Sequence, residues 1–165
     1  MKKLAFALLF GCTLLSCVTD NNHSEKNITL IENYVQSVED LDYTAMDSIL
    51  DDDYIGLGPS HNDSIGKMQS IENWKNNVEN LYESIQYLRS RNIAVRIEDG
   101  DHQGDWVSNW AELKIVYKKD KASVTIWANS LYQIKNNKII RSYTIYNEAD
   151  ALEQLGYVFI NPNDL

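Results

Sequence analysis

The chain has 165 residues, of which 44% are hydrophobic and 24% charged, and it contains 7 glycines and 2 prolines. The length predicts a single domain, and the composition excludes a disordered, collagen-like or disulfide-rich protein. Acidic residues number 24 against 15 basic ones, for a formal charge of −9, and the basic residues are not clustered as nucleic-acid binding requires. We therefore expect no nucleic-acid partner.

A short hydrophobic segment stands at the N-terminus. A basic start precedes the apolar run Leu4–Leu15, which is too short to span a bilayer as a helix and predicts a signal peptide over residues 1–16. The run ends in Leu15-Ser16-Cys17, which resembles the lipobox of bacterial lipoproteins and implies lipidation of Cys17. The alternative is an unmodified thiol near an ordinary cleavage site. We expect a protein of the bacterial envelope, lipid-anchored and extracytoplasmic at the periplasmic face or outer membrane, with a polar tether over residues 17–26.

The spacing of apolar residues predicts three helices in the next part of the chain. The first runs to about Leu41, with Ser24 or Asn27 as its cap, and a short second helix begins at Asp42. The third and longer helix follows steps of three and four through Met68, Ile71, Trp74, Val78, Leu81 and Ile85.

A strand-like run at Tyr54–Leu57 lies between the second and third helices, and after the third helix the apolar period changes to two. This period predicts strands at Ile93–Ile97, Trp106–Tyr117, Ser123–Ile134 and Ile139–Asn147, the last three forming an antiparallel meander. These strands carry apolar residues on both faces, so we expect the helices to cover one face and a second copy of the chain, in a homodimer, to cover the other. A short helix follows the last strand.

Three helices followed by a strongly bent antiparallel sheet resemble the cone-shaped nuclear-transport-factor-2-like superfamily, and several strings are similar to its SnoaL-like and ketosteroid-isomerase-like branches. The matching strings are Tyr34-Val35, Asp42, Asp52-Asp53-Tyr54, Gly66-Lys67 with Ile71 and Trp74, Lys138-Ile139, and Asn147 with Gln154-Leu155-Gly156. The resemblance implies an α+β fold over residues 27–156, a cone-shaped barrel with three N-terminal helices packed in the concave face of the sheet and a short C-terminal helix. Residues 157–165 remain as a C-terminal tail.

The resemblance also implies a pocket for a small molecule, but the positions of the catalytic acids hold no carboxylate. Tyr34 matches the oxyanion tyrosine of the ketosteroid isomerases, whereas the general-base position falls on Gly58 and the protonated-acid position on Asn129. The acid/base Asp of the SnoaL-like cyclases falls on Asn147, whose amide cannot take and return a proton near neutral pH. No catalytic residue, metal ligand or cofactor site is therefore expected.

We expect the domain to bind a small apolar or amphipathic molecule without strong acid/base catalysis, and to meet the membrane through its lipid anchor only. The expected ligand contacts are Tyr34, Tyr54, Trp74, Trp110, Trp127, Asn129 and Asn147. Trp127 and Asn129 share a strand parity and must face the same way, whereas the facing of Trp106 and Trp110 is not fixed by the pattern.

Three alternatives stay open. The polar candidates can be ordinary hydrogen-bonded groups in a cone filled by its own side chains. The domain can be an isomerase, cyclase or dehydratase that uses Tyr34 with an unrecognised base, for which His61, Asp63 and Glu112 are candidates. It can also be a protein-interaction module of the envelope.

Overall fold

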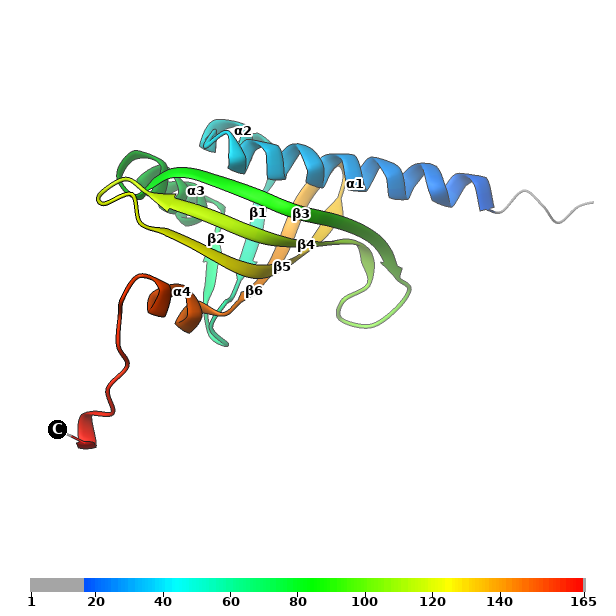
Figure 1. Cartoon of the computed structure of the whole chain (residues 1–165). Helices are drawn as coiled ribbons and strands as arrows, with labels where there is room; N and C mark the ends of the chain where they lie inside the picture. The colour runs from blue at the N-terminus through cyan, green and yellow to red at the C-terminus, as the bar shows by residue number, and fades with distance from the viewer. Residues whose placement is uncertain (1–16, 165) are drawn as a thin grey trace, which may run out of the picture.

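The computed structural model describes residues 17–164, in which one curved sheet carries helices on its concave face (Figure 1). The expected signal peptide, residues 1–16, and the side chain of Cys17 lie outside this description. The strands are β1 (Leu50–Leu57), β2 (Ser64–Gly66), β3 (Tyr82–Ile97), β4 (Gly104–Tyr117), β5 (Ser123–Lys135) and β6 (Lys138–Tyr146). The helices are α1 (Cys17–Glu39), α2 (Tyr43–Ile49), α3 (Lys67–Asn76) and α4 (Glu148–Gln154), with a π-helical turn at Asn77–Leu81 and a 3-10 turn at Pro162–Asp164. The α+β architecture expected from the sequence is confirmed.

The sheet has the strand order β2-β1-β6-β5-β4-β3. Strands β4 to β6 form the expected antiparallel meander, and β3 extends it by pairing antiparallel with β4. In contrast, β1 pairs with β6 in parallel, with Ile55 opposite Arg141. The sheet is therefore mixed. A parallel pair needs a long connection, and here the connection from β1 to β6 contains α3 and three of the long strands.

Helix α1 begins earlier than the sequence suggested and includes the segment expected to be a polar tether. Within this segment, the Nε2 atom of His23 lies 2.8 Å from a carboxylate oxygen of Asp105, at the start of β4. Arg96 of β3 donates to the other oxygen of Asp105 at 2.8 Å. These contacts tie the first part of α1 to the far end of the sheet.

Helix α3 is shorter than predicted, because its apolar steps continue into a strand. The chain leaves the helix at Asn76, makes the π-helical turn and enters β3 at Tyr82, so Ile85 pairs with Ile115 of β4 and is only 4% exposed. Met68, expected on the apolar stripe of this helix, is 87% exposed. A step of four residues suits both a helix and one face of a strand, and pairing with β4 decides between them.

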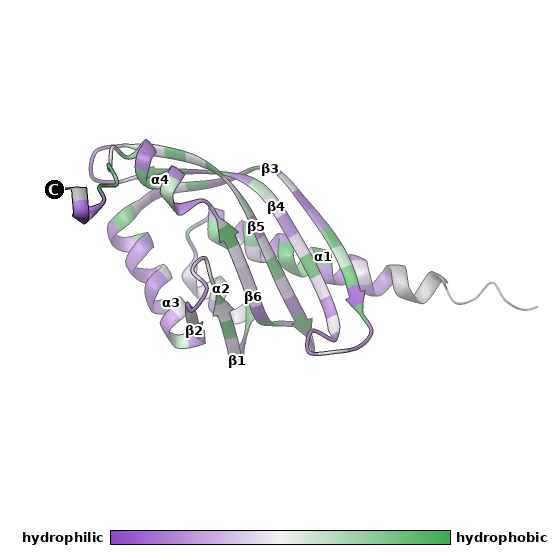
Figure 2. Ribbon diagram, turned by 90° about the horizontal axis from the view of Figure 1, so that it is seen from below, coloured by the Kyte–Doolittle hydropathy of each residue, from purple (hydrophilic) through white to green (hydrophobic). Residues whose placement is uncertain are grey.

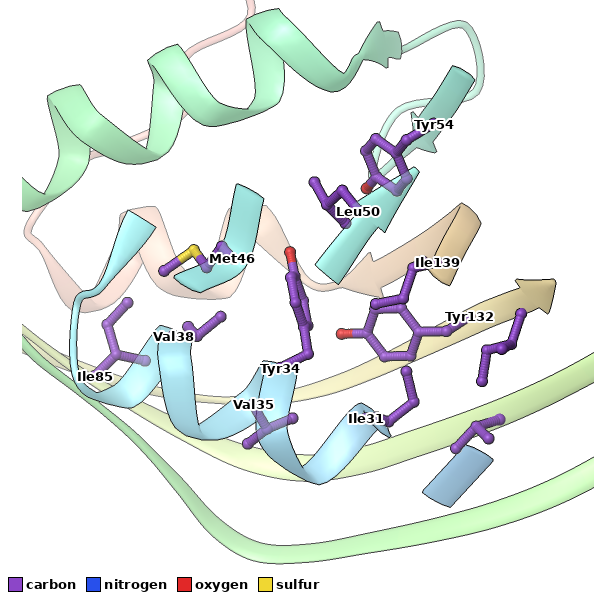
Figure 3. Packing of buried hydrophobic residues seen from close by; sticks show 12 residues of the cluster. Ile31, Tyr34, Val35, Val38, Met46, Leu50, Tyr54, Ile85, Tyr132 and Ile139 are labelled. Carbon is purple, nitrogen blue, oxygen red and sulfur yellow. The ribbon is translucent and has the colours of Figure 1, made fainter. Parts of the chain in front are cut away.

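The core lies between α1, α2 and the concave face of the sheet (Figure 3). Ile31 and Val38 of α1 are 0% and 1% exposed, and they share this core with Met46 of α2 and Ile139 of β6, both 0% exposed. Asp42 caps α2 by accepting from the backbone N–H groups of Thr44 and Ala45. The apolar stripe predicted for α1 is therefore the stripe that packs on the sheet.

The two faces of the long strands differ in their surroundings, and Figure 2 shows polar and apolar residues alternating along them. In β5, the side chains of Val124, Ile126 and Tyr132 are buried on the concave face, whereas Trp127 is 53% exposed on the outer face. No helix within residues 17–164 is both long and apolar enough to cross a membrane.

Candidate functional site

A cavity of about 410 Å³ opens inside the concave face of the sheet. Its walls come from α1, α3 and α4 and from the inward-facing residues of β1 and β3 to β6. Seven of the ten tyrosines of the chain line it: Tyr34, Tyr54, Tyr82, Tyr87, Tyr117, Tyr132 and Tyr146. Of the sequence-predicted contacts, Tyr34, Tyr54 and Trp74 lie on this cavity.

Three buried tyrosines form the deep part of the cavity. Tyr34 follows Ile31 by three residues on the inward stripe of α1, and its ring meets that of Tyr132 edge-on, with centroids 5.6 Å apart (Figure 3). Tyr54 of β1 completes the group, and the three side chains are each at most 6% exposed. Phenol rings supply apolar surface together with a polar tip, so this end can hold both a hydrocarbon and one hydrogen-bonding group of a ligand.

The deep tyrosines stay protonated at neutral pH. Burial raises the pKa of Tyr34 well above its ordinary value, the neighbouring phenols of Tyr132, Tyr54 and Tyr87 raise it further, and a hydrogen bond from Trp74 opposes the change. Burial also raises the pKa of Tyr54, and hydrogen bonds with Ser142 and Ser70 oppose this change. These phenols are thus suited to donate hydrogen bonds and not to accept protons.

Tyr54 is held in place from two sides. Its Oη atom hydrogen-bonds with Oγ of Ser142 in β6 at 2.7 Å. A Cβ atom at Gly56 would lie 2.8 Å from the same Oη atom, which is too close. The hydroxyl of Tyr54 therefore occupies space that is free because Gly56 has no side chain. The position of this hydroxyl therefore depends on two residues to which the sequence analysis gave no role.

Small hydroxyl residues of β5 and β6 also line the cavity: Ser130, Ser142 and Thr144. Oγ of Ser130 hydrogen-bonds with Oγ1 of Thr144 at 3.1 Å. None of the three was predicted from the sequence. Ser130 shares its strand parity with Val124, Ile126 and Tyr132, and that parity is the signal that identifies it.

Three expected contacts lie on the outer face of the sheet instead. The rings of Trp110 and Trp127 pack against each other there, 6.2 Å between centroids, and each side chain is 53% exposed. Asn129 lies on the same face, where it donates to Ser108 at 3.3 Å. Asn129 therefore lies outside the cavity lining, because a shift of one residue along a strand moves a side chain to the other face.

Two further residues of the sequence analysis lie outside the cavity lining. Asn147 caps α4, where its side-chain oxygen accepts from the backbone N–H of Asp150 at 3.2 Å. Trp106 packs on the outer face against Tyr143, 6.1 Å between ring centroids, and donates to the carbonyl of His102. The polar end of Asn147 is used by the backbone and does not point to a ligand.

The position expected for a general base cannot carry a side chain without rearrangement. Gly58 has a φ of +95°, which L residues rarely adopt, and a Cβ atom there would lie 2.4 Å from the carbonyl oxygen of Thr144. The glycine is thus required by the close approach of β1 to β6. A carboxylate at this place would need β6 to move.

The other candidate bases do not lie beside the deep tyrosines. Glu112 is on the outer face, paired with Arg89 at 3.2 Å. His61 and Asp63 lie in the loop between β1 and β2, outside the lining. Of the described residues that line the cavity, Glu148 alone carries a carboxylate. Burial is the larger cause of the raised pKa of Tyr146, and the negative charge of Glu148 raises that pKa further. Within residues 17–164, no three His, Cys, Asp or Glu side chains group as metal ligands.

Neither a protein-family model nor a curated protein matches the sequence. Solved structures do match. A proposed polyketide cyclase from Xanthomonas campestris has a TM-score of 0.65 at 13% identity, covering 80% of this chain and 98% of that one. A proposed SnoaL-like polyketide cyclase from Shewanella denitrificans has a TM-score of 0.60 at 12% identity, covering 78% of this chain and 96% of that one. A nuclear-transport-factor-2-like protein from Burkholderia xenovorans has a TM-score of 0.60 at 10% identity, covering 79% of this chain and 96% of that one.

The chain has the nuclear-transport-factor-2-like cone fold. The resemblance inferred from the sequence is thereby confirmed at the level of the fold. Helices α1 to α3 pack against the curved sheet, and the tyrosine-lined cavity lies inside its concave face.

Proposed function

We propose that this protein binds a small, mainly apolar or amphipathic molecule in the cone cavity and does not carry out strong acid/base catalysis. The observation that carries the proposal is the cavity itself, about 410 Å³ of space with buried tyrosine hydroxyls at its deep end. A volume in this range suits a ligand of one to a few rings, and few polar groups suffice to orient it. A carbonyl or hydroxyl oxygen of the ligand would accept from the deep phenols.

The chemistry of the lining supports binding more than proton transfer. A positioned general acid or base typically contributes about 10² to 10⁴ in rate, and it must reach the reacting group. Gly58 has no side chain, Asn147 caps a helix, and the charge of Glu148 acts on Tyr146 and not on Tyr34. The phenols that remain are donors, because burial raises the pKa of Tyr34 and Tyr54.

Thermal unfolding of the full-length protein tests the proposal with 1-tetralone, a neutral bicyclic ketone, and related ring compounds. A ligand that binds the folded state alone raises the midpoint of unfolding, by an amount that grows with the logarithm of its concentration relative to its Kd. We expect stabilisation of the wild type and of Tyr43→Phe, which alters a tyrosine outside the cavity. Tyr34→Phe should bind roughly threefold to tenfold more weakly, because one neutral hydrogen bond contributes about 0.5–1.5 kcal/mol. No response of the wild type to any ring compound, neutral or cationic, would contradict the proposal.

The outer face of the sheet supports a proposal about assembly, namely that a second copy of the chain covers it. Trp110 and Trp127 are each 53% exposed there, and Ile93 and Ile145 are 63% and 60% exposed. A twofold axis brings the same apolar patch from both copies together, and soluble monomers rarely leave large apolar patches open. Analytical ultracentrifugation should find a dimer that Trp110→Lys dissociates and Met68→Lys does not. A monomeric wild type, or a complex with a different envelope protein through this face, would contradict the proposal.

The N-terminal sequence supports a proposal about location, namely that Cys17 is lipidated and holds the protein at the extracytoplasmic side of the bacterial envelope. Labelling of bacterial cells with palmitate tests it. We expect label on the wild type and on Cys12→Ala, and none on Cys17→Ala. Label that persists in Cys17→Ala would contradict lipidation at this residue.

A further inference from the structure

Four aromatic side chains line the cavity outside the deep group: Trp74, Tyr82, Tyr117 and Tyr146. The ring of Tyr82 stands edge-on to both Trp74 and Tyr117, with centroids 6.5 Å and 5.5 Å apart. Each of the four is partly exposed, unlike the buried deep tyrosines. This aromatic rim therefore presents ring surface to a molecule that enters the cavity.

The one charged side chain among the described residues that line the cavity is negative. Glu148, the first residue of α4, lines the cavity beside Tyr146, and Asp63 of the loop before β2 also raises the pKa of Tyr146, with burial the larger cause. Among the described residues that line the cavity there is no Lys, Arg or His. The formal charge of the whole chain is −9, so its long-range field also favours cations.

Aromatic faces carry negative potential and attract organic cations, most strongly where several rings surround the cation and water is partly excluded. A carboxylate beside the rings adds a direct attraction. The charge of Glu148 would repel an anionic ligand at this rim, and a neutral ligand would gain nothing from that charge.

We propose that the ligand of this cavity is an organic cation, an apolar body with an ammonium group that lies at the aromatic rim beside Glu148. This inference rests on the proposed function, since it assigns the charge of the molecule that the cone binds. The apolar body extends toward the deep tyrosines, and a substituted ammonium group, which is weakly hydrated, lies among Trp74, Tyr82 and Tyr146.

Equilibrium dialysis with two probes of one shape tests the charge preference. Benzyltrimethylammonium carries the cation, and neopentylbenzene replaces its nitrogen by carbon. The full-length protein is compared with Glu148→Gln and with Glu153→Gln, a control on the same helix whose side chain does not line the cavity. We expect Glu148→Gln to weaken the cation about threefold to fivefold, the size of an exposed ion pair, and to leave neopentylbenzene unchanged. Glu153→Gln should alter neither affinity.

The outcomes separate the two proposals. If neopentylbenzene binds and the cation does not, the preference for a cation is overturned while the cavity remains a binding site. The preference is also overturned if Glu148→Gln leaves the affinity for the cation unchanged, or weakens both probes equally. If neither probe binds the wild type, the proposed function fails as well.

Discussion

Replacing Gly58 by alanine tests whether the cavity wall tolerates any side chain at the position where the resemblance to ketosteroid isomerases led us to expect a base. The substitution adds one carbon at a φ of +95°, with the carbonyl oxygen of Thr144 only 2.4 Å from the new atom. Gly100→Ala is the matched control, because Gly100 has a φ of +80° and no atom within 4 Å of the added carbon. Both variants place an L residue at a positive φ, but only in Gly58→Ala does the added carbon collide with a backbone atom.

The expected free-energy changes follow from these two terms. An L side chain in the left-handed region costs about 1–2 kcal/mol, and this is the whole cost expected for Gly100→Ala. Gly58→Ala adds the displacement of the β6 backbone, for which overpacking of a folded interior costs about 1–3 kcal/mol more. We therefore expect a loss of roughly 2–5 kcal/mol for Gly58→Ala.

Urea unfolding measures both variants against the wild type, and equal slopes would show that the same structure unfolds in each case. The reasoning requires Gly58→Ala to be the less stable variant by at least about 1 kcal/mol. Equal stability of Gly58→Ala and Gly100→Ala would refute it. In that case the place of the missing base is open to a side chain, and the argument that the fold excludes a carboxylate there is lost.

Three further predictions concern stability. Met46→Ala should lower the free energy of unfolding in urea by about 2–5 kcal/mol, because Met46 is 0% exposed. Met68→Ala should change it by no more than about 0.5 kcal/mol, because Met68 is 87% exposed. Equal losses in the two variants would contradict the packing described. Asn147→Ala should lower the free energy of unfolding by about 1 kcal/mol, and Asn147→Asp should leave it almost unchanged, because Asp caps a helix as well as Asn. A large loss of stability in Asn147→Asp would argue against capping. Burial raises the pKa of Tyr82 to about 12 from an ordinary value of 10.0. The protonated phenol therefore contributes fully to stability below about pH 10, and this contribution is lost as the pH rises toward 12. Urea unfolding at pH 9 and 11 should show a smaller loss of stability for Tyr82→Phe than for the wild type.

The sequence predicts the fold well where a single period describes a segment. The apolar residues Ile31, Val35 and Val38 recur at helical spacing, and all three are buried on the side of α1 that packs on the sheet. Beyond Asn76 the spacing fits a helix and a strand equally, so the end of α3 is decided by pairing with β4, which is a contact between distant residues.

The site is predicted less completely, because strand parity shows which residues share a face and not which face is inside. Trp110 and Trp127 are aromatic and therefore resemble core or ligand contacts, yet they lie on the outer face. Ser130 and Ser142 carry no such signal and line the cavity. Only the register of the meander and the curvature of the sheet separate the two sets.

Proton nuclear magnetic resonance of 1-tetralone in D₂O with the full-length protein tests the central claim most directly. The same spectra report binding, through broadening of the ligand lines, and catalysis, through loss of the signals of the protons next to the carbonyl by exchange with solvent. The account predicts broadened lines with exchange no faster than in buffer alone. Exchange accelerated by the protein would reveal a base at the cavity and contradict the account.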